Sequence, residues 1–155
     1  MSRFRPSRDP DFLIGPHHDP YLQRWWLIPR NRVFNVYLHH VRRDDDDRAL
    51  HDHPWPSLSI LLDGRLGEVF LRGGAEDYRE ARRWVPLWRG ATFAHRLVLP
   101  DPKVGAWTLF ITGPRVREWG FHCPRRWVPW REFVEPDRPG DIGRGCGEHD
   151  LGGAE

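Results

Sequence analysis

The chain has 155 residues, 39% of them hydrophobic, which is enough for one domain with a buried core and excludes wholesale disorder. Its net charge of +2 comes from 24 basic and 22 acidic residues and lacks the strong basic excess typical of nucleic-acid or membrane-surface binding. No apolar run approaches the roughly 18 residues of a transmembrane helix, and the basic N-terminus lacks the apolar core of a signal peptide.

Both ends of the chain differ in composition from its middle. Residues 1–20 carry four prolines among charged residues and are expected to form an irregular lead-in. Residues 136–155 are rich in glycine and have almost nothing to bury, which predicts a flexible tail. A single domain over residues 21–135 remains.

Within that domain, glycine and proline recur too often for long helices, and short runs rich in β-branched and aromatic residues lie between them. This spacing predicts an antiparallel β-sandwich or barrel. Residues 33–41 also fit helical spacing, but their valines and aromatic side chains favour a strand. The predicted strands are, in chain order, 25–28, 33–41, 57–62, 66–71, 78–85, 92–99, 106–112, 116–121 and 127–134.

Two histidines stand two positions apart, after the acidic run 44–47, which is expected to be a solvated loop. In a strand, His51 and His53 point to the same face, whereas Asp52 points away and suits an ion pair with an arginine better than metal ligation. Two such imidazoles can ligate one metal ion if a third ligand comes from elsewhere. His95, in a later apolar strand, is the candidate. The alternative is that the three histidines pack or hydrogen-bond without a metal.

This segment resembles the first motif of the cupin superfamily, which runs His-x-His, three or four residues, Glu, six residues, Gly. His51, His53 and Gly64 match it, and Ser57 stands in place of the glutamate. The second cupin motif, a histidine that follows a proline and a glycine, is matched more loosely at His95. The resemblance covers about residues 33–112 and implies an all-β, double-stranded β-helix (jelly-roll) barrel in a single domain.

Through that resemblance, His51, His53 and His95 are expected to hold one divalent metal ion. Three neutral imidazoles leave positions open, and thiol dioxygenases of the cupin class are similar in using three histidines. Fe(II) is favoured, with Ni, Zn and Cu as alternatives. The expected function is a small iron-type oxygenase acting on a small polar or anionic molecule. A non-catalytic ligand-binding cupin module and a metal-independent sugar isomerase or epimerase remain alternatives.

Tyr37 is the candidate acid or base. It shares one strand face with His39, and either side chain could project inward near the metal. The apolar residues at 34, 36 and 38 favour the other face as the core side, which would turn Tyr37 and His39 outward.

Four further residues are candidates for substrate binding. Trp55 and Ser57 continue the face of His53, which would place them in the pocket, with a core position as the alternative for Trp55. Arg115 and Arg117 share a strand face and could orient an anionic group at the mouth of the barrel.

The C-terminal part carries aromatic residues and two cysteines. The aromatic residues between 119 and 133 are expected to close the barrel or to bury a homodimer face rather than to stack on bases. His122, Cys123, Cys146 and His149 include the residue types of a zinc site, but their spacing matches no standard finger. Two cysteines do not form a disulfide framework and suit a reducing compartment, which predicts a cytoplasmic protein.

Overall fold

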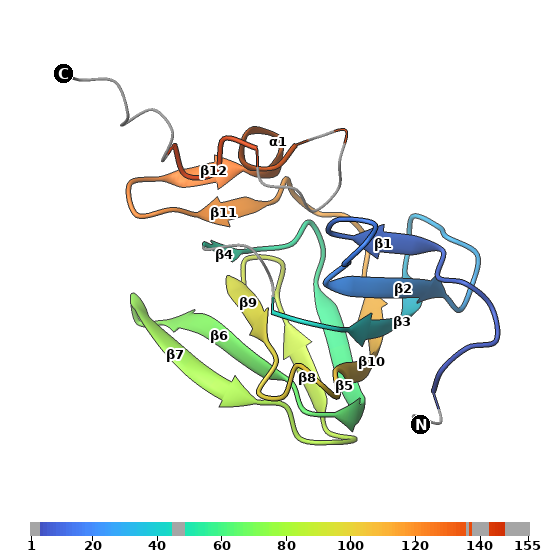
Figure 1. Cartoon of the computed structure of the whole chain (residues 1–155). Coiled ribbons are helices and arrows are strands. Elements are labelled where there is room, and N and C mark those ends of the chain that lie inside the picture. Colours follow the sequence, from blue (N-terminus) through green and yellow to red (C-terminus); the bar gives the residue numbers. More distant parts are fainter. Residues whose placement is uncertain (1–3, 45–48, 136, 138–142, 148–155) are drawn as a thin grey trace.

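Two six-stranded antiparallel sheets build the protein, as the computed structural model in Figure 1 shows. The structure describes residues 4–44, 49–135, 137 and 143–147. The first sheet has the order β1 (Phe12–Ile14), β2 (Leu22–Trp26), β3 (Asn35–Val41), β10 (Ala106–Thr112), β5 (Ser57–Gly64) and β8 (Pro86–Arg89). The second has the order β12 (Trp127–Pro129), β11 (Gly120–His122), β4 (Leu50–His51), β9 (His95–Val98), β6 (Gly67–Arg72) and β7 (Ala75–Glu80).

From β3 onward the chain passes back and forth between the sheets. β4 lies in the second sheet, β5 in the first, β6 and β7 in the second, β8 in the first, β9 in the second and β10 in the first. This winding places strands that are distant in sequence side by side, so that β4 lies between β9 and β11. The all-β jelly-roll architecture predicted from the sequence is confirmed.

Several elements differ from the predicted runs. The predicted segment 33–41 forms a strand, as favoured, but only from Asn35 onward, and β1 lies within the N-terminal stretch that was expected to be irregular. Of the predicted strand 116–121, only residues 120 and 121 belong to an observed strand, β11, which continues to His122. The predicted strand 127–134 is divided into β12 and the short helix α1 (Trp130–Phe133). Pro129 has no N–H to extend a ladder, and it immediately precedes the helix.

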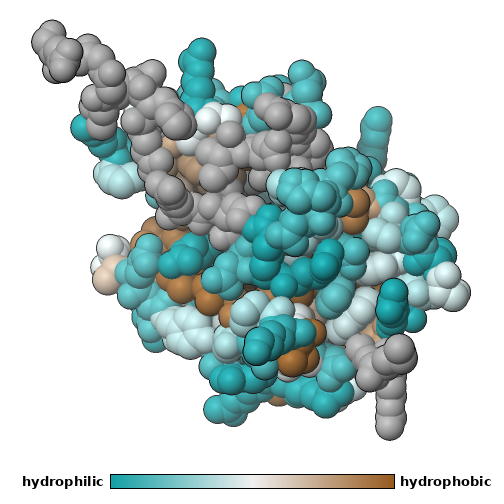
Figure 2. All heavy atoms as spheres, in the orientation of Figure 1, coloured by the Kyte–Doolittle hydropathy of each residue, from teal (hydrophilic) through white to brown (hydrophobic). Residues whose placement is uncertain are grey.

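Apolar side chains cover both faces of the first sheet. One cluster fills one end of the interior, and its buried members are Leu22, Val41, Leu61, Leu66, Leu99 and Ala106. Another cluster lies on the outer face, where Phe4 packs against Trp25, Leu38, Leu62 and Trp107. The face shown in Figure 2 is mostly hydrophilic, with hydrophobic side chains visible in places between the polar ones. No helix in the described part of the chain is long and apolar enough to cross a membrane.

A third apolar cluster closes the opposite end of the barrel. The Phe121 ring on β11 stacks on Phe133 of α1, and the indole rings of Trp119 and Trp130 stack beside them. Aromatic closure of the barrel, one of the two uses expected for these residues, is therefore observed.

The two cysteines, which were expected to suit a reducing compartment, form a disulfide. Cys123 follows β11 and is bonded to Cys146, with 5.6 Å between their Cα atoms. The N–H groups of Gly143 and Gly145 donate to the carbonyl oxygen of Phe133. Residues 143–147 are thus attached beside α1, whereas most of the predicted flexible tail and residues 45–47 of the acidic run lie outside the described residues. Because both sulfur atoms are used in the disulfide, the zinc site considered for this region is wrong.

Candidate metal centre

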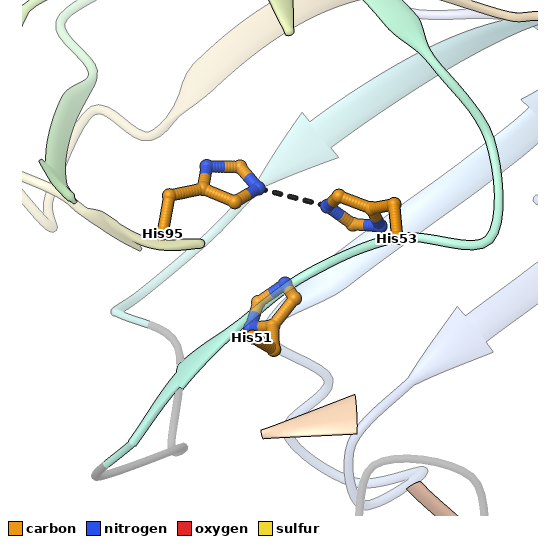
Figure 3. A group of neighbouring side chains, drawn as sticks. All are labelled: His51, His53 and His95. Carbon is orange, nitrogen blue, oxygen red and sulfur yellow. Dashed lines mark hydrogen bonds between the residues drawn. The ribbon is translucent and has the colours of Figure 1, made fainter. Parts of the chain in front are cut away.

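Three histidines, from β4, the loop that follows it and β9, converge inside the barrel (Figure 3). His51 on β4 lies directly opposite His95 on β9, and His53 reaches the same point from the loop after β4. One ligand nitrogen of each ring lies within 4.8 Å of the other two. The Nε2 atoms of His53 and His95 are 2.8 Å apart. The three residues singled out by their spacing therefore form one cluster, although β4 ends at His51 and does not carry His53.

A buried glutamate holds the far side of the His95 ring. Glu68 lies on β6, two positions before Phe70, the ladder partner of His95, and accepts a hydrogen bond from His95 Nδ1. The same carboxylate accepts from Arg89 Nε at 2.5 Å and from Arg79 Nε at 2.7 Å. Arg89 belongs to β8 of the first sheet, so this ion pair joins the two sheets across the interior.

The charges around Glu68 decide where the proton of His95 lies. Burial alone would raise the pKa of Glu68, but the hydrogen bond from His95 and the charge of Arg89 outweigh it and lower the pKa below its usual range. The ionised carboxylate can only accept, so Nδ1 of His95 must donate. Burial lowers the pKa of His95 to about 4, which makes the ring neutral at pH 7 and leaves a lone pair on Nε2.

His53 is also neutral. Burial, followed by the charges that His95 and His51 would carry, lowers its pKa well below the usual value. Because His95 Nε2 has the lone pair, His53 Nε2 carries the proton that the two nitrogens share. A divalent metal ion would take the place of this proton. Three imidazole ligands, one of them fixed by a carboxylate, fit Fe(II), Ni(II), Cu(II) or Zn(II) and leave coordination positions open.

A cavity of about 300 Å³ lies beside the histidine cluster. Most of its wall is apolar, and its polar wall residues are Arg24, His39, Ser59, Arg89 and Thr108 in addition to the three histidines. Trp55, expected to form a pocket wall, lines this cavity. Ser57 is buried opposite Arg89 in the sheet and does not line it.

Tyr37 and His39 share one face of β3, as expected, but this is the inner face. His39 lines the cavity, whereas the buried Tyr37 ring lies beside it with the two ring centroids 5.9 Å apart. The expectation that they turn outward is wrong because the apolar Leu38 packs on the outer cluster around Trp25. Both faces of this strand are covered, so apolar residues do not identify the interior.

Neither arginine expected at the substrate lines the cavity. Arg115 pairs with the exposed Glu118, and Arg117 pairs with Asp52 at 2.8 Å. The predicted pairing of Asp52 with an arginine is thus found. Asp52 is buried and also accepts from the N–H of Gly120 and from Trp127 Nε1.

Sequence reasoning missed the two arginines that do line the cavity, Arg24 and Arg89. Arg24 is two residues from the buried Leu22 on β2, so strand alternation places it on the interior face. That alternation was the one signal available for Arg24. Nothing local marks Arg89 or its partner Glu68, because their contact depends on how β8 and β6 face each other.

Comparisons with known proteins identify relatives only at the level of the fold. No protein-family model matches the sequence, and no curated protein matches it significantly. The structure of Fe(II)-HppE with the alternative substrate (S)-1-HPP aligns over 70% of this chain and 57% of that chain, with 12% identity and a TM-score of 0.55. A structure of hydroxypropylphosphonic acid epoxidase from S. wedmorenis aligns over 59% and 50%, with 12% identity and a TM-score of 0.50.

The chain therefore spans little more than half of the length of these proteins. A mannose-6-phosphate isomerase-like protein from Ralstonia eutropha JMP134 aligns over 70% of this chain and 99% of its own, with 16% identity and a TM-score of 0.53. At such low identity the likeness establishes a shared fold and nothing more.

Proposed function

The chain has a cupin fold, and we propose that it is a metal-dependent enzyme of the iron-type oxygenase class that acts on a small polar or anionic molecule. The observation that carries this proposal is the hydrogen bond of His95 Nδ1 to Glu68, because it directs the free lone pair of Nε2 to the point where His51 and His53 meet. The likeness in fold to Fe(II)-HppE supports iron as the metal.

In this proposal each residue has a defined task. His51, His53 and His95 hold one divalent ion, and bound Fe(II) supplies the redox chemistry that an oxygenase needs. The aromatic wall beside the cluster, which includes Phe110, Trp119 and Phe121, limits the access of water.

The acid or base of the reaction has two candidates. His39 lines the cavity and can hold a proton next to a bound molecule. Tyr37, predicted for this role, lies behind His39 and would act through it. Substrate contacts from Trp55, Ser57, Arg115 and Arg117 stay predictions, and Trp55 is the one of the four that lines the cavity.

One observation also favours a second function. A histidine oriented by a carboxylate can serve as a base without any metal, and His95, which lines the cavity, is oriented in this way by Glu68 behind it. A metal-independent sugar isomerase or epimerase would use His95 as its base. The presence or absence of a bound metal ion separates the two proposals.

The test is metal analysis of the purified protein after anaerobic loading with Fe(II), and separately with Zn(II) and Ni(II). We expect one equivalent of metal in the wild type and in the exposed control His18→Ala, and none in His51→Ala or His95→Ala. Metal-free wild type of unchanged stability after loading would overturn the metal site. Oxygen uptake of the iron form is then measured with a panel of small thiols and organic acids. Stoichiometric iron without any uptake would favour a ligand-binding module over an oxygenase.

A further inference from the structure

A second polar pair lies in the wall of the same cavity, separate from the histidine cluster. Arg24 on β2 and His39 on β3 are directly opposite each other in the ladder, and both line the cavity. Arg24 Nε donates to His39 Nε2 at 2.9 Å. The guanidinium carbon of Arg24 also lies 4.8 Å from the centre of the Tyr37 ring. These contacts fix the position of the guanidinium group but bring no negative charge to it.

The charge of Arg24 has no counter-ion among the described residues. Among the described residues no carboxylate forms an ion pair with it, and the groups that act on it electrostatically are Tyr37, Tyr21 and the cation Arg30. Arg89, by contrast, forms an ion pair with the buried Glu68. Burial lowers the pKa of Arg24, yet an arginine stays protonated in a protein. A cation that is partly withdrawn from water without an anion is costly, so a function in binding would explain its position.

His39 contributes a neutral surface next to this cation. Burial, and then the charge of Arg24, lowers the pKa of His39 well below its usual value. Its Nε2 accepts from Arg24, so the single ring proton lies on Nδ1. The pair therefore has a net charge of +1, carried on the planar fork of Arg24, whose geometry suits the two oxygens of a carboxylate or phosphonate.

We propose that Arg24, supported by His39, binds the oxyanion group of a small organic acid whose apolar body extends along Phe110 toward the histidine cluster. Phe110 contacts both the Arg24–His39 pair and the histidine cluster, since its ring centre lies 4.9 Å from that of His39 and 6.5 Å from that of His53. The remaining wall is largely apolar, and the volume of about 300 Å³ limits the ligand to a small molecule. That this acid is the substrate rests on the proposed function, whereas its binding at Arg24 does not.

The proposal is tested by NMR titration of the full chain, with and without Zn(II), against three compounds of matched shape. These are 3-methylbutanoate, its neutral amide, and 2-methylpropylphosphonate. We expect both acids to bind and the amide to bind at least about tenfold more weakly, because a charge-assisted hydrogen bond is lost. The relative affinity of the two acids identifies which oxyanion the site prefers.

Three variants locate the binding. Arg24→Gln is expected to weaken acid binding at least about tenfold, and Arg24→Lys, which keeps the charge but not the fork, to weaken it less. Arg30→Gln removes the same charge from a nearby exposed position and should bind like the wild type. Thermal unfolding shows whether each variant folds. If Arg24→Gln does not fold, the comparison of acid with amide on the wild type and on Arg24→Lys decides.

Equal binding of acid and amide, or unchanged acid binding in Arg24→Gln, would overturn this inference. The outcome is independent of the metal site, because His95→Ala should lose metal and keep acid binding. Conversely, Arg24→Gln should keep its metal. A protein that binds metal but no acid would refute the oxyanion subsite and leave the proposed function standing.

Discussion

Glu68 on β6 accepts a hydrogen bond from Nδ1 of His95 on β9, although 27 residues separate them in the chain. In the ladder between the two strands His95 is opposite Phe70, so Glu68, two positions away on β6, lies on the same face as His95. Arg89 reaches the same carboxylate from the opposite sheet. One buried anion thus connects the two halves of the barrel and orients a histidine of the candidate metal centre.

Glu68→Gln should weaken metal binding by about 10–100-fold, because a neutral amide no longer favours the Nδ1–H form of His95 so strongly. It should also lower the free energy of unfolding by about 3 kcal/mol, since Arg89 is left buried without its anion. Competition with a chelator measures the first effect and urea unfolding the second.

The matched control for this change is Glu80→Gln. Glu80 pairs with Arg65 on the surface, where both side chains are exposed, and its loss should cost less than about 1 kcal/mol and leave metal affinity unchanged. Wild-type metal affinity in a folded Glu68→Gln protein would show that the carboxylate does not orient His95.

The metal-free protein should lose stability as the pH falls from about 6.5 toward 4. The pKa of His95 and that of His40 are lowered to about 4, and those of His39 and His53 are lowered well below 6.5, in each case first by burial. In this range the unfolded chain takes up protons that the folded protein does not, so the histidine contribution is complete above pH 6.5. Each histidine adds at most about 1.4 kcal/mol per pH unit to the slope.

Urea unfolding at several pH values checks this. His40 stacks on Trp107 away from the metal centre, so His40→Gln should reduce the slope without affecting metal binding. The reduction should be less than the full value because His40 is only partly buried. His18→Gln, at an exposed position, serves as the control. A stability that is constant between pH 6.5 and 4.5 would show that the buried histidines take up protons in the folded state.

The histidine pair at the start of the cluster could be predicted because its spacing is local. His51 and His53 are two positions apart, and His95 is a histidine within an apolar strand. The resemblance to the cupin motifs implied a jelly-roll fold in which these strands lie side by side, and the structure places all three histidines together. Glu68 could not be predicted in the same way, since its role depends on the register between β6 and β9, which the sequence does not display.

Other failures have the same physical origin. Strand alternation correctly placed Tyr37 and His39 on one face of the strand. Which face points inward depends on what covers each face, and this cannot be read from the strand itself, because Trp25 and Trp107 cover the outer face with apolar side chains. The pairing of Cys123 with Cys146 depends on how the chain returns to α1, and this is a property of the folded structure rather than of the spacing.

Reduction of the Cys123–Cys146 disulfide should lower the free energy of unfolding by about 3 kcal/mol, because the bond closes a loop with a sequence separation of 23. Unfolding in the presence and absence of reductant measures it, and Cys146→Ser should match the reduced wild type. Reduction should first loosen the structure beside α1, where Trp130 and Val134 line the cavity. Two titratable thiols in the native protein purified without reductant would contradict the disulfide.

Two serines on β5 should respond in opposite ways to replacement by alanine. The Oγ of Ser57 is buried and has no hydrogen-bond partner among the described residues, so Ser57→Ala removes an unsatisfied group and should leave stability unchanged or raise it. Ser59 Oγ accepts from Arg89 Nη1 at 2.7 Å, so Ser59→Ala should cost about 1–3 kcal/mol. Urea unfolding of the two variants compares them directly. A marked loss of stability in Ser57→Ala would mean that its hydroxyl is bonded in solution, whereas weaker binding of a small acid by that variant would place Ser57 at the ligand, as its position after the His-x-His pair predicted.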